Sequence, residues 1–246
     1  GEVQKEVVLD TLARDYGIAV TFGPSQTICI ERPTGTGEHI EVIFEAGNPY
    51  DATTGFRVER GEVGSGIRYH RDLGALPLAF YRAIEETVYE TLEQGLHGWE
   101  VTDCLVTLTH QGMCPITTAA DFRKLTPLAL MEALRRAATE VCEPIEELEL
   151  EIPEDTFGAV CGVLINARAT MRQTLPEGSS IRIVCDIPTA ELRGVEQQLP
   201  GLTRGDGGWV SSFAGYVPIT NEPPTRPRIG PNPLNRLHYL AEVARS

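Results

Sequence analysis

The chain has 246 residues, of which 41% are hydrophobic and 23% charged, a balance typical of a folded protein rather than a disordered one. Its formal net charge of −14 excludes a general polyanion-binding surface, so any contact with nucleic acid must be local. The sequence has neither the roughly 18 consecutive apolar residues of a membrane span nor a signal-peptide pattern, which predicts a cytoplasmic protein without a membrane partner.

The length predicts about two domains, and the first segment, 1–26, looks like the end of another. Apolar residues at 3, 7, 8 and 12 lie on one helical stripe that ends at Gly17, and 18–22 is predicted to be a strand. One helix and one strand cannot bury a core alone. We therefore expect an incomplete domain here, less stable than the rest of the chain.

Residues 27–141 combine short strands with two long helices. Alternating residues predict strands over 27–33 and 39–46, joined by the turn TGTG, and another strand over 56–63. The glycine-rich stretch 61–66 is expected to be a hairpin turn. Apolar residues at every fourth position from Leu76 to Leu92 predict a helix that ends before Gly95.

A strand over 99–108, a loop over 110–118 and a second helix over 119–141 complete this segment. Pro127 lies inside the second helix, so the helix is either kinked there or begins again with Thr126 as its cap.

From residue 142 the predicted order is strand, helix, strand, strand, helix, strand, the order of a ferredoxin-like βαββαβ domain. Its first strand alternates leucine and isoleucine at 148, 150 and 152 with glutamate at 147, 149 and 151, so one face is expected in a core and the other in water. After residue 220, five prolines predict an extended linker, followed by a short helix that ends the segment 221–246.

Catalytic motifs are missing from this sequence: it contains no P-loop, no nucleophile elbow and no HExxH. His110 and Cys114 supply only half of a zinc site. None of the six cysteines forms a CxxC pair, so free thiols are expected. The sequence predicts that this chain binds no metal or cofactor and is not itself an enzyme.

The loop that contains Gln111, Gly112, Met113, Cys114, Pro115 and Ile116 is unusual because it carries apolar residues where turns are normally polar. Such a loop either forms a contact site or folds its apolar side chains back into the core, and the sequence leaves both possibilities open.

Several long motifs resemble one family. The first segment, GEVQKEVVLDTLARDYGI, resembles the end of domain III of elongation factor G. Three further segments resemble its domain IV and the start of domain V: IERPTGTGE, LGALPLAFYRAIEETVYETLEQGLHGWEVTDCLVTL and TTAADFRKLTPLALMEALRRAATEVCEP. GLHGWEVTDC and the PRIGPNPLNRLHYLAEVAR tail are more similar to the ribosomal protection proteins of tetracycline resistance. Because only Lys5 and Lys124 among 21 basic residues are lysine, we expect the actinobacterial oxytetracycline-resistance branch.

The resemblance implies an α+β fold with the domain III remnant in 1–26, a domain IV similar to domain 2 of ribosomal protein S5 in 27–141, and a ferredoxin-like domain V in 142–220. It also implies a longer parent, a translational GTPase that holds GTP and Mg in a domain outside this chain. Domain IV would reach the decoding region of the small ribosomal subunit and dislodge the drug from 16S rRNA. This chain, by itself, is expected to be monomeric.

Three tip loops carry the implied rRNA contacts. Pro115 matches the proline of the longest loop, while Gly112, Met113 and Cys114 stand where relatives usually have two tyrosines and a serine. Stacking worth about 1–3 kcal/mol per base is therefore lost there. Asn48, Pro49 and Tyr50 match a second loop, in which Asp51 replaces an aromatic residue; Leu73, Gly74 and Ala75 match the third.

The tail is the one segment with a positive net charge, four arginines against two glutamates. We expect Arg236, His238 and Arg245 to make further ribosome contacts; the competing possibility is that the helix merely docks on the domain V sheet. The alternative functions are the C-terminal part of an elongation factor G-type translocase and a stand-alone interaction module. The translocase tip would usually present a histidine and a serine-rich turn, which HQGMCPIT does not.

Overall fold

The computed structural model describes residues 10–12, 14–18, 27–72 and 74–244 of the chain. Residues 10–12 and 14–16 are helical, in agreement with the predicted first helix, whereas the strand expected at 18–22 lies almost wholly outside the described residues. None of the helices among the described residues is long and apolar enough to cross a membrane.

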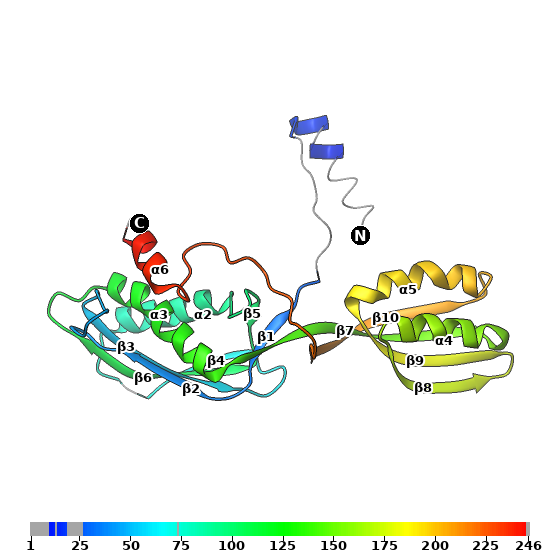
Figure 1. Ribbon diagram of the computed structural model, residues 1–246, viewed down its shortest axis with the longest axis horizontal. Coiled ribbons are helices and arrows are strands. Elements are labelled where there is room, and N and C mark those ends of the chain that lie inside the picture. Colours follow the sequence, from blue (N-terminus) through cyan, green and yellow to red (C-terminus); the bar gives the residue numbers. More distant parts are fainter. Residues whose placement is uncertain (1–9, 13, 19–26, 73, 245–246) are drawn as a thin grey trace.

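The part that follows forms an α+β domain, called here the four-stranded domain. Its sheet has the order β2 (Gly37–Glu41), β3 (Ala52–Arg60), β6 (Cys104–Met113) and β4 (Ile67–Arg71). Helices α2 (Leu78–Leu92) and α3 (Ala119–Ala137) both cover one face of this sheet (Figure 1). The core between them contains Phe56, Val58, Val106 and Leu108 from the strands and Ile84, Val88, Phe122 and Leu134 from the helices.

Several expected strands differ from those observed. The segment 99–108 is interrupted at Asp103, whose φ of 52° breaks the extended chain and separates β5 (Glu100–Val101) from β6. The hairpin expected at 61–66 is wrong, because β4 crosses to the far side of β6 and pairs with it in parallel. The turn TGTG likewise joins no hairpin: β1 (Ile30–Pro33) pairs with β5 and β7 in another sheet.

The second helix is continuous through Pro127 and begins after Thr118 rather than at Thr126. The carboxylate of Asp121 accepts hydrogen bonds from the Thr118 amide at 2.8 Å and from its hydroxyl at 2.7 Å, which fixes the first turn. The helix ends at Ala137, four residues earlier than expected, because Ala138 has a φ of 57° and Thr139 already begins the next strand.

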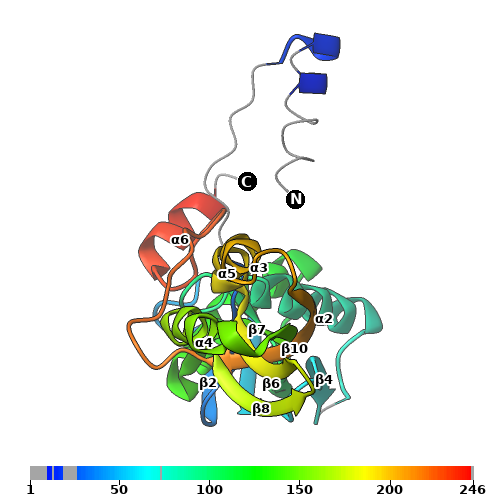
Figure 2. The same ribbon diagram turned by 90° about the vertical axis from the view of Figure 1, so that its right-hand side faces the viewer.

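The second half of the chain is a ferredoxin-like domain, as predicted. Its strands are β7 (Thr139–Pro153), β8 (Thr170–Glu177), β9 (Ser180–Pro188) and β10 (Gly208–Pro218), in the antiparallel order β10-β7-β9-β8. Helices α4 (Phe157–Asn166) and α5 (Thr189–Leu202) lie together on one face, visible end-on in Figure 2. Leu148, Leu150 and Ile152 are buried beneath them, and the glutamates between them point to the open face, as the alternation predicted.

One strand joins the two domains. The first residues of β7 pair with β1, and the later ones pair with β9 and β10. The expected boundary between 141 and 142 falls inside this strand, so the two domains share a continuous backbone ladder; the bounds themselves remain a prediction.

Two charged residues of β1 hold this junction together. Glu31 is fully buried and accepts hydrogen bonds from the amides of Leu96, His97 and Trp99, at 2.7–3.1 Å, and from the Thr139 hydroxyl at 2.8 Å. Next to it, the buried Arg32 pairs with Asp103 at 2.7 Å and donates to the carbonyl of Tyr216 in β10. These contacts are the reason that two charges can be buried at the same place.

The proline-rich segment is extended, as predicted, and it lies against the four-stranded domain. The indole of Trp99 donates to the Pro224 carbonyl at 2.7 Å, and the amide of Arg226 donates to the His97 carbonyl at 2.8 Å. Gly98 allows this close approach: it has a φ of 86°, and a Cβ atom there would lie 2.0 Å from the Arg226 oxygen. The segment leads to α6 (Arg236–Val243), which packs on α3 (Figure 1).

Candidate functional site

Three connections leave the four-stranded sheet at one end, the end away from the ferredoxin-like domain (Figure 1). β3 begins at Ala52, which pairs with Met113, the last residue of β6. The parallel strand β4 also finishes toward this end, where Arg71 pairs with Leu108. The connections 42–51, 72–77 and 114–118 therefore share one end of the domain, where all three sequence-predicted tip loops lie. Leu73 is outside the described residues.

The connection between β6 and α3, residues 114–118, is shorter than the loop predicted over 110–118. Residues 110–113 belong to β6, because their backbone groups pair with 52–55 of β3, and the turn itself is only Cys114–Thr117. Gly112 packs so closely on Thr53 that an added Cβ would lie 3.0 Å from its side chain. Met113, Pro115 and Ile116 are exposed, so the apolar residues of this segment do not fold back into the core.

A network of hydrogen bonds ties this turn to the neighbouring connection. The Thr117 hydroxyl donates to the carbonyl of Asp51 and accepts from the amide of Cys114 at 2.8 Å. The amide of Asp51 in turn donates to the carboxylate of Asp121 at 3.4 Å. Burial raises the pKa of Asp121, but its bonds from Thr118 and Asp51 outweigh that effect and leave the pKa below its usual range. Both loops are thus fixed to the start of α3.

The predicted residues of the second loop take different positions. Asn48 acts as an internal brace: its amide nitrogen donates to the carbonyls of Val42 and Ala52, and its oxygen accepts from the Tyr50 amide at 2.9 Å. Tyr50 is half-buried against the core, and this burial raises the pKa of its hydroxyl. Pro49 is exposed. Gly74 and Ala75 in the remaining loop are also exposed, so Pro49, Gly74 and Ala75 are the ones available for contact.

Sequence reasoning missed one tip residue. Phe44 lies in the connection 42–51, has 77% of its surface exposed and adopts a φ of 65°, a region that bulky side chains rarely occupy. The alternation predicted Phe44 inside a strand over 39–46, but β2 ends at Glu41, and the left-handed conformation is imposed by the turn geometry, which has no signal in the sequence.

The tail helix does not lie on the ferredoxin-like sheet, so the competing possibility of docking there is wrong. The buried residues Tyr239 and Val243 pack against Leu128 of α3 in the four-stranded domain. Arg236 forms two hydrogen bonds with Glu41, at 2.7 and 2.9 Å, so its charge is already engaged within the chain. His238 is largely exposed, and Arg245 is outside the described residues.

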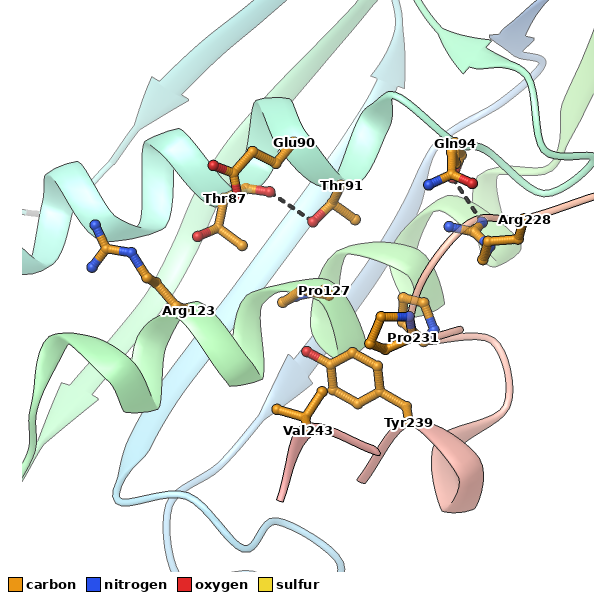
Figure 3. Close-up of a pocket in the computed structure, with 11 residues that line it drawn as sticks. Thr87, Glu90, Thr91, Gln94, Arg123, Pro127, Arg228, Pro231, Tyr239 and Val243 are labelled. Carbon is orange, nitrogen blue, oxygen red and sulfur yellow. Dashed lines mark hydrogen bonds between the residues drawn. The ribbon is translucent and has the colours of Figure 1, made fainter. Parts of the chain in front are cut away.

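A cavity of about 250 Å³ remains where the tail crosses α2 and α3 (Figure 3). The two arginines that line it have partners within the chain. Arg123 pairs with Glu86 at 2.7 Å, and Arg228 donates to the carbonyls of Gln94 and Gly95, which follow α2. Arg228 thus links the tail to the turn that follows α2. We therefore assign this cavity to tail docking.

The potential metal ligands are dispersed over residues 10–12, 14–18, 27–72 and 74–244. No three His, Cys, Asp or Glu side chains come together there as a metal site would require. The six cysteines are free, and burial raises the pKa of Cys185 to about 11, far from a reactive thiolate.

Two family models match the chain: "Elongation factor G, domain IV" over residues 26–138 and "Elongation factor G C-terminus" over residues 140–227. The oxytetracycline resistance protein of Streptomyces rimosus is 44% identical over 99% of the chain, and the tetracycline resistance protein TetM of Streptomyces lividans is 45% identical over 86%. The chain spans 38% and 34% of the length of these two relatives. A crystal structure of a protein from Thermus thermophilus, 21% identical, shares the fold with a TM-score of 0.71 over all of this chain and 36% of that one.

Proposed function

The chain belongs to the elongation factor G-related family that includes the tetracycline-resistance proteins, and from this premise we propose that it is the ribosome-contacting part of a ribosomal protection protein. In this proposal the four-stranded domain is domain IV and the ferredoxin-like domain is domain V of a longer protein. GTP and Mg bind in another domain of that protein. This chain is then a monomeric, cytoplasmic binding module without catalysis of its own.

The turn Cys114–Thr117, which hydrogen bonds fix to the neighbouring connection, is the observation that supports the proposal best. Pro115 and Ile116 are exposed at the far end of the domain, while Thr117 and Asp121 fix the backbone behind them. A proline has a restricted φ and no amide that needs a partner, so it can press an apolar face against a base or ribose. We propose that this turn enters the decoding region of 16S rRNA and deforms the tetracycline site, so that the drug dissociates.

The energy for this step comes from GTP-dependent binding of the whole protein, not from the turn. The turn has to be stiff, because a flexible one would yield instead of the rRNA. The Thr117 hydroxyl bonds to the carbonyl of Asp51, and the amide of Asp51 bonds to Asp121, so this chain of contacts gives stiffness without the tyrosines that the family resemblance implies for this loop.

Pro115→Gly tests the proposal in a chimera that carries this chain in place of the matching part of the Streptomyces rimosus protein. Ribosome-stimulated GTP hydrolysis should stay within about twofold of the parent chimera, since that centre lies elsewhere. Release of labelled tetracycline from drug-loaded ribosomes should fall about two- to fivefold, the equivalent of the 0.4–1 kcal/mol of backbone freedom that glycine adds.

The control is Pro176→Gly, which removes an exposed proline from β8 of the ferredoxin-like domain. This variant should release drug as fast as the parent chimera. Equal release rates for Pro115→Gly and Pro176→Gly would remove the turn from the mechanism. Failure of the 246-residue chain to co-sediment with small ribosomal subunits would refute the ribosome-contacting role itself.

A further inference from the structure

The four-stranded sheet has a second face that no described helix covers. Since α2 and α3 both pack on the other face, the residues that alternate with the core point away from them. The register places Ile40 opposite Gly55, Gly55 opposite His110, and Thr53 opposite Gly112 at the tip end of this face. We call these five residues the open-face platform.

The centre of the platform is flat because it is built on glycine. A Cβ atom at Gly55 would lie 2.9 Å from the Cβ of His110 and 2.9 Å from the Cγ1 of Ile40. These two side chains therefore close over the bare backbone of Gly55. Beside them, Gly112 has no side chain, so the Thr53 side chain alone stands above this pair of residues on the open face. Gly55 is itself buried and lies at the β-bulge between Gly55 and Phe56, so the surface offered to another molecule is formed by the side chains of His110 and Ile40 above it.

An exposed aromatic residue borders the platform. The amide of Ile43 donates to the Thr53 hydroxyl at 3.0 Å, which brings the chain to the edge of the platform just before Phe44. Asn48 braces the same loop, so the left-handed conformation of Phe44 is imposed by a rigid frame. A strained backbone that presents an exposed ring destabilises the fold, and such strain concentrates at functional positions.

We propose that the open-face platform and Phe44 bind an unpaired RNA base by stacking, a second contact beyond the tip turn. Planar rings on a flat sheet face are how RNA-binding sheets accept splayed bases. Arg68 points to the same face from β4, opposite Leu105, with no ion-pair or hydrogen-bond partner among the described residues. It lies roughly 17 Å along the strand from His110, where it can meet a phosphate of the same strand.

RNA is a better match than a protein partner for two reasons. The rings of His110 and Phe44 offer stacking faces instead of a pocket for a protruding side chain, and Arg68 supplies the phosphate contact. The inference rests on the proposed function for the source of the RNA, the ribosome, but the chemistry can be tested without ribosomes.

The test is a titration of the 246-residue chain with single-stranded hexamers of adenylate and uridylate, followed by amide chemical shifts. Shifts should gather at Ile40, Thr53, Gly55 and His110. His110→Ala should weaken hexamer binding on the order of tenfold, as expected for the loss of one stacked base. The matched control, His238→Ala on α6, should bind like the wild type.

Phe44→Gly separates binding from folding, because glycine relieves the strained φ while removing the ring. Its unfolding temperature should rise slightly while its affinity for the hexamers falls. The proposal would be overturned by amide chemical shift changes that are absent or lie elsewhere. Equal hexamer affinities for His110→Ala and His238→Ala would also overturn it.

Small ribosomal subunits then distinguish the two proposals. Hexamer binding at the platform without subunit binding would refute the ribosome role and keep the platform. Subunit binding that survives both His110→Ala and Phe44→Gly unchanged would overturn the platform as a ribosome contact and leave the tip turn in place.

Discussion

Glu31→Gln should destabilise the junction of the two domains by about 3–5 kcal/mol. In the native protein one carboxylate oxygen accepts from the amides of His97 and Trp99, and the other accepts from the Leu96 amide and the Thr139 hydroxyl. Glutamine replaces one of these oxygens with an NH₂ group that cannot accept. Two donors then lose their acceptor, at about 1–3 kcal/mol for each buried group left unpaired.

Urea unfolding followed by tryptophan fluorescence measures this loss. The chain has two tryptophans, Trp99 at the junction and Trp209 in the ferredoxin-like domain, so Trp209→Phe leaves a reporter beside the altered group. Trp99 is only 2% exposed, and its emission should shift to longer wavelength when the junction opens. The matched control is Glu38→Gln, whose side chain is 60% exposed.

The expected destabilisation is a large part of the 5–15 kcal/mol that typically holds a folded protein together. The midpoint for Glu31→Gln should therefore be clearly lower than that for Glu38→Gln. Equal midpoints for the two variants would show that the buried carboxylate does not organise the junction, and would refute the reasoning from its four hydrogen bonds.

Two further predictions concern the tail. Gly98→Ala should release the proline-rich segment, since the new Cβ would lie 2.0 Å from the Arg226 oxygen; trypsin, which does not cut before Pro227, should then cleave after Arg228 faster than in the wild type, and equal cleavage rates would argue against the close contact. Burial raises the pKa of Glu41, but its bonds from Arg236 and His39 outweigh that effect and leave a net value below its usual range. This pair stabilises the protein above the unfolded pKa of about 4.3 and the effect disappears as pH falls through the lower folded pKa. Arg236→Met should thus lower the unfolding temperature more at pH 7 than at acid pH, where only its bond to the Gly47 carbonyl is lost, and a pH-independent difference would mean that packing, not charge, is lost.

Local patterns in the sequence predicted most of the secondary structure. The four-residue period from Leu76 to Leu92 gave α2, and the alternation around Leu148 gave the central strand of the ferredoxin-like domain, because both patterns reflect which side of a single element is buried. The long motifs gave the family, and the two domain models and the similar resistance proteins confirm it. The connections 42–51, 72–77 and 114–118 leave the sheet at one end, but Gln111, Gly112 and Met113 belong to β6 instead of a loop, and the rRNA contacts stay a prediction.

The tertiary structure decided everything that depends on pairing between distant segments. β1 and β2 follow one another closely but enter different sheets, and β4 crosses β6 instead of forming a hairpin. No local pattern encodes such choices, since an alternating strand can pair with any complementary edge.

The same limit applies to individual side chains. Glu31 looks like any strand glutamate in the sequence, yet three backbone amides of 96–99 and the hydroxyl of Thr139 converge on it. The tail looked like a basic surface, but Arg236 meets Glu41 from 195 positions away, and Tyr239 is buried on α3. Burial and charge pairing are properties of the assembled chain, so the sequence alone determined the elements and the family, and only the fold determined which residues are left to meet a partner.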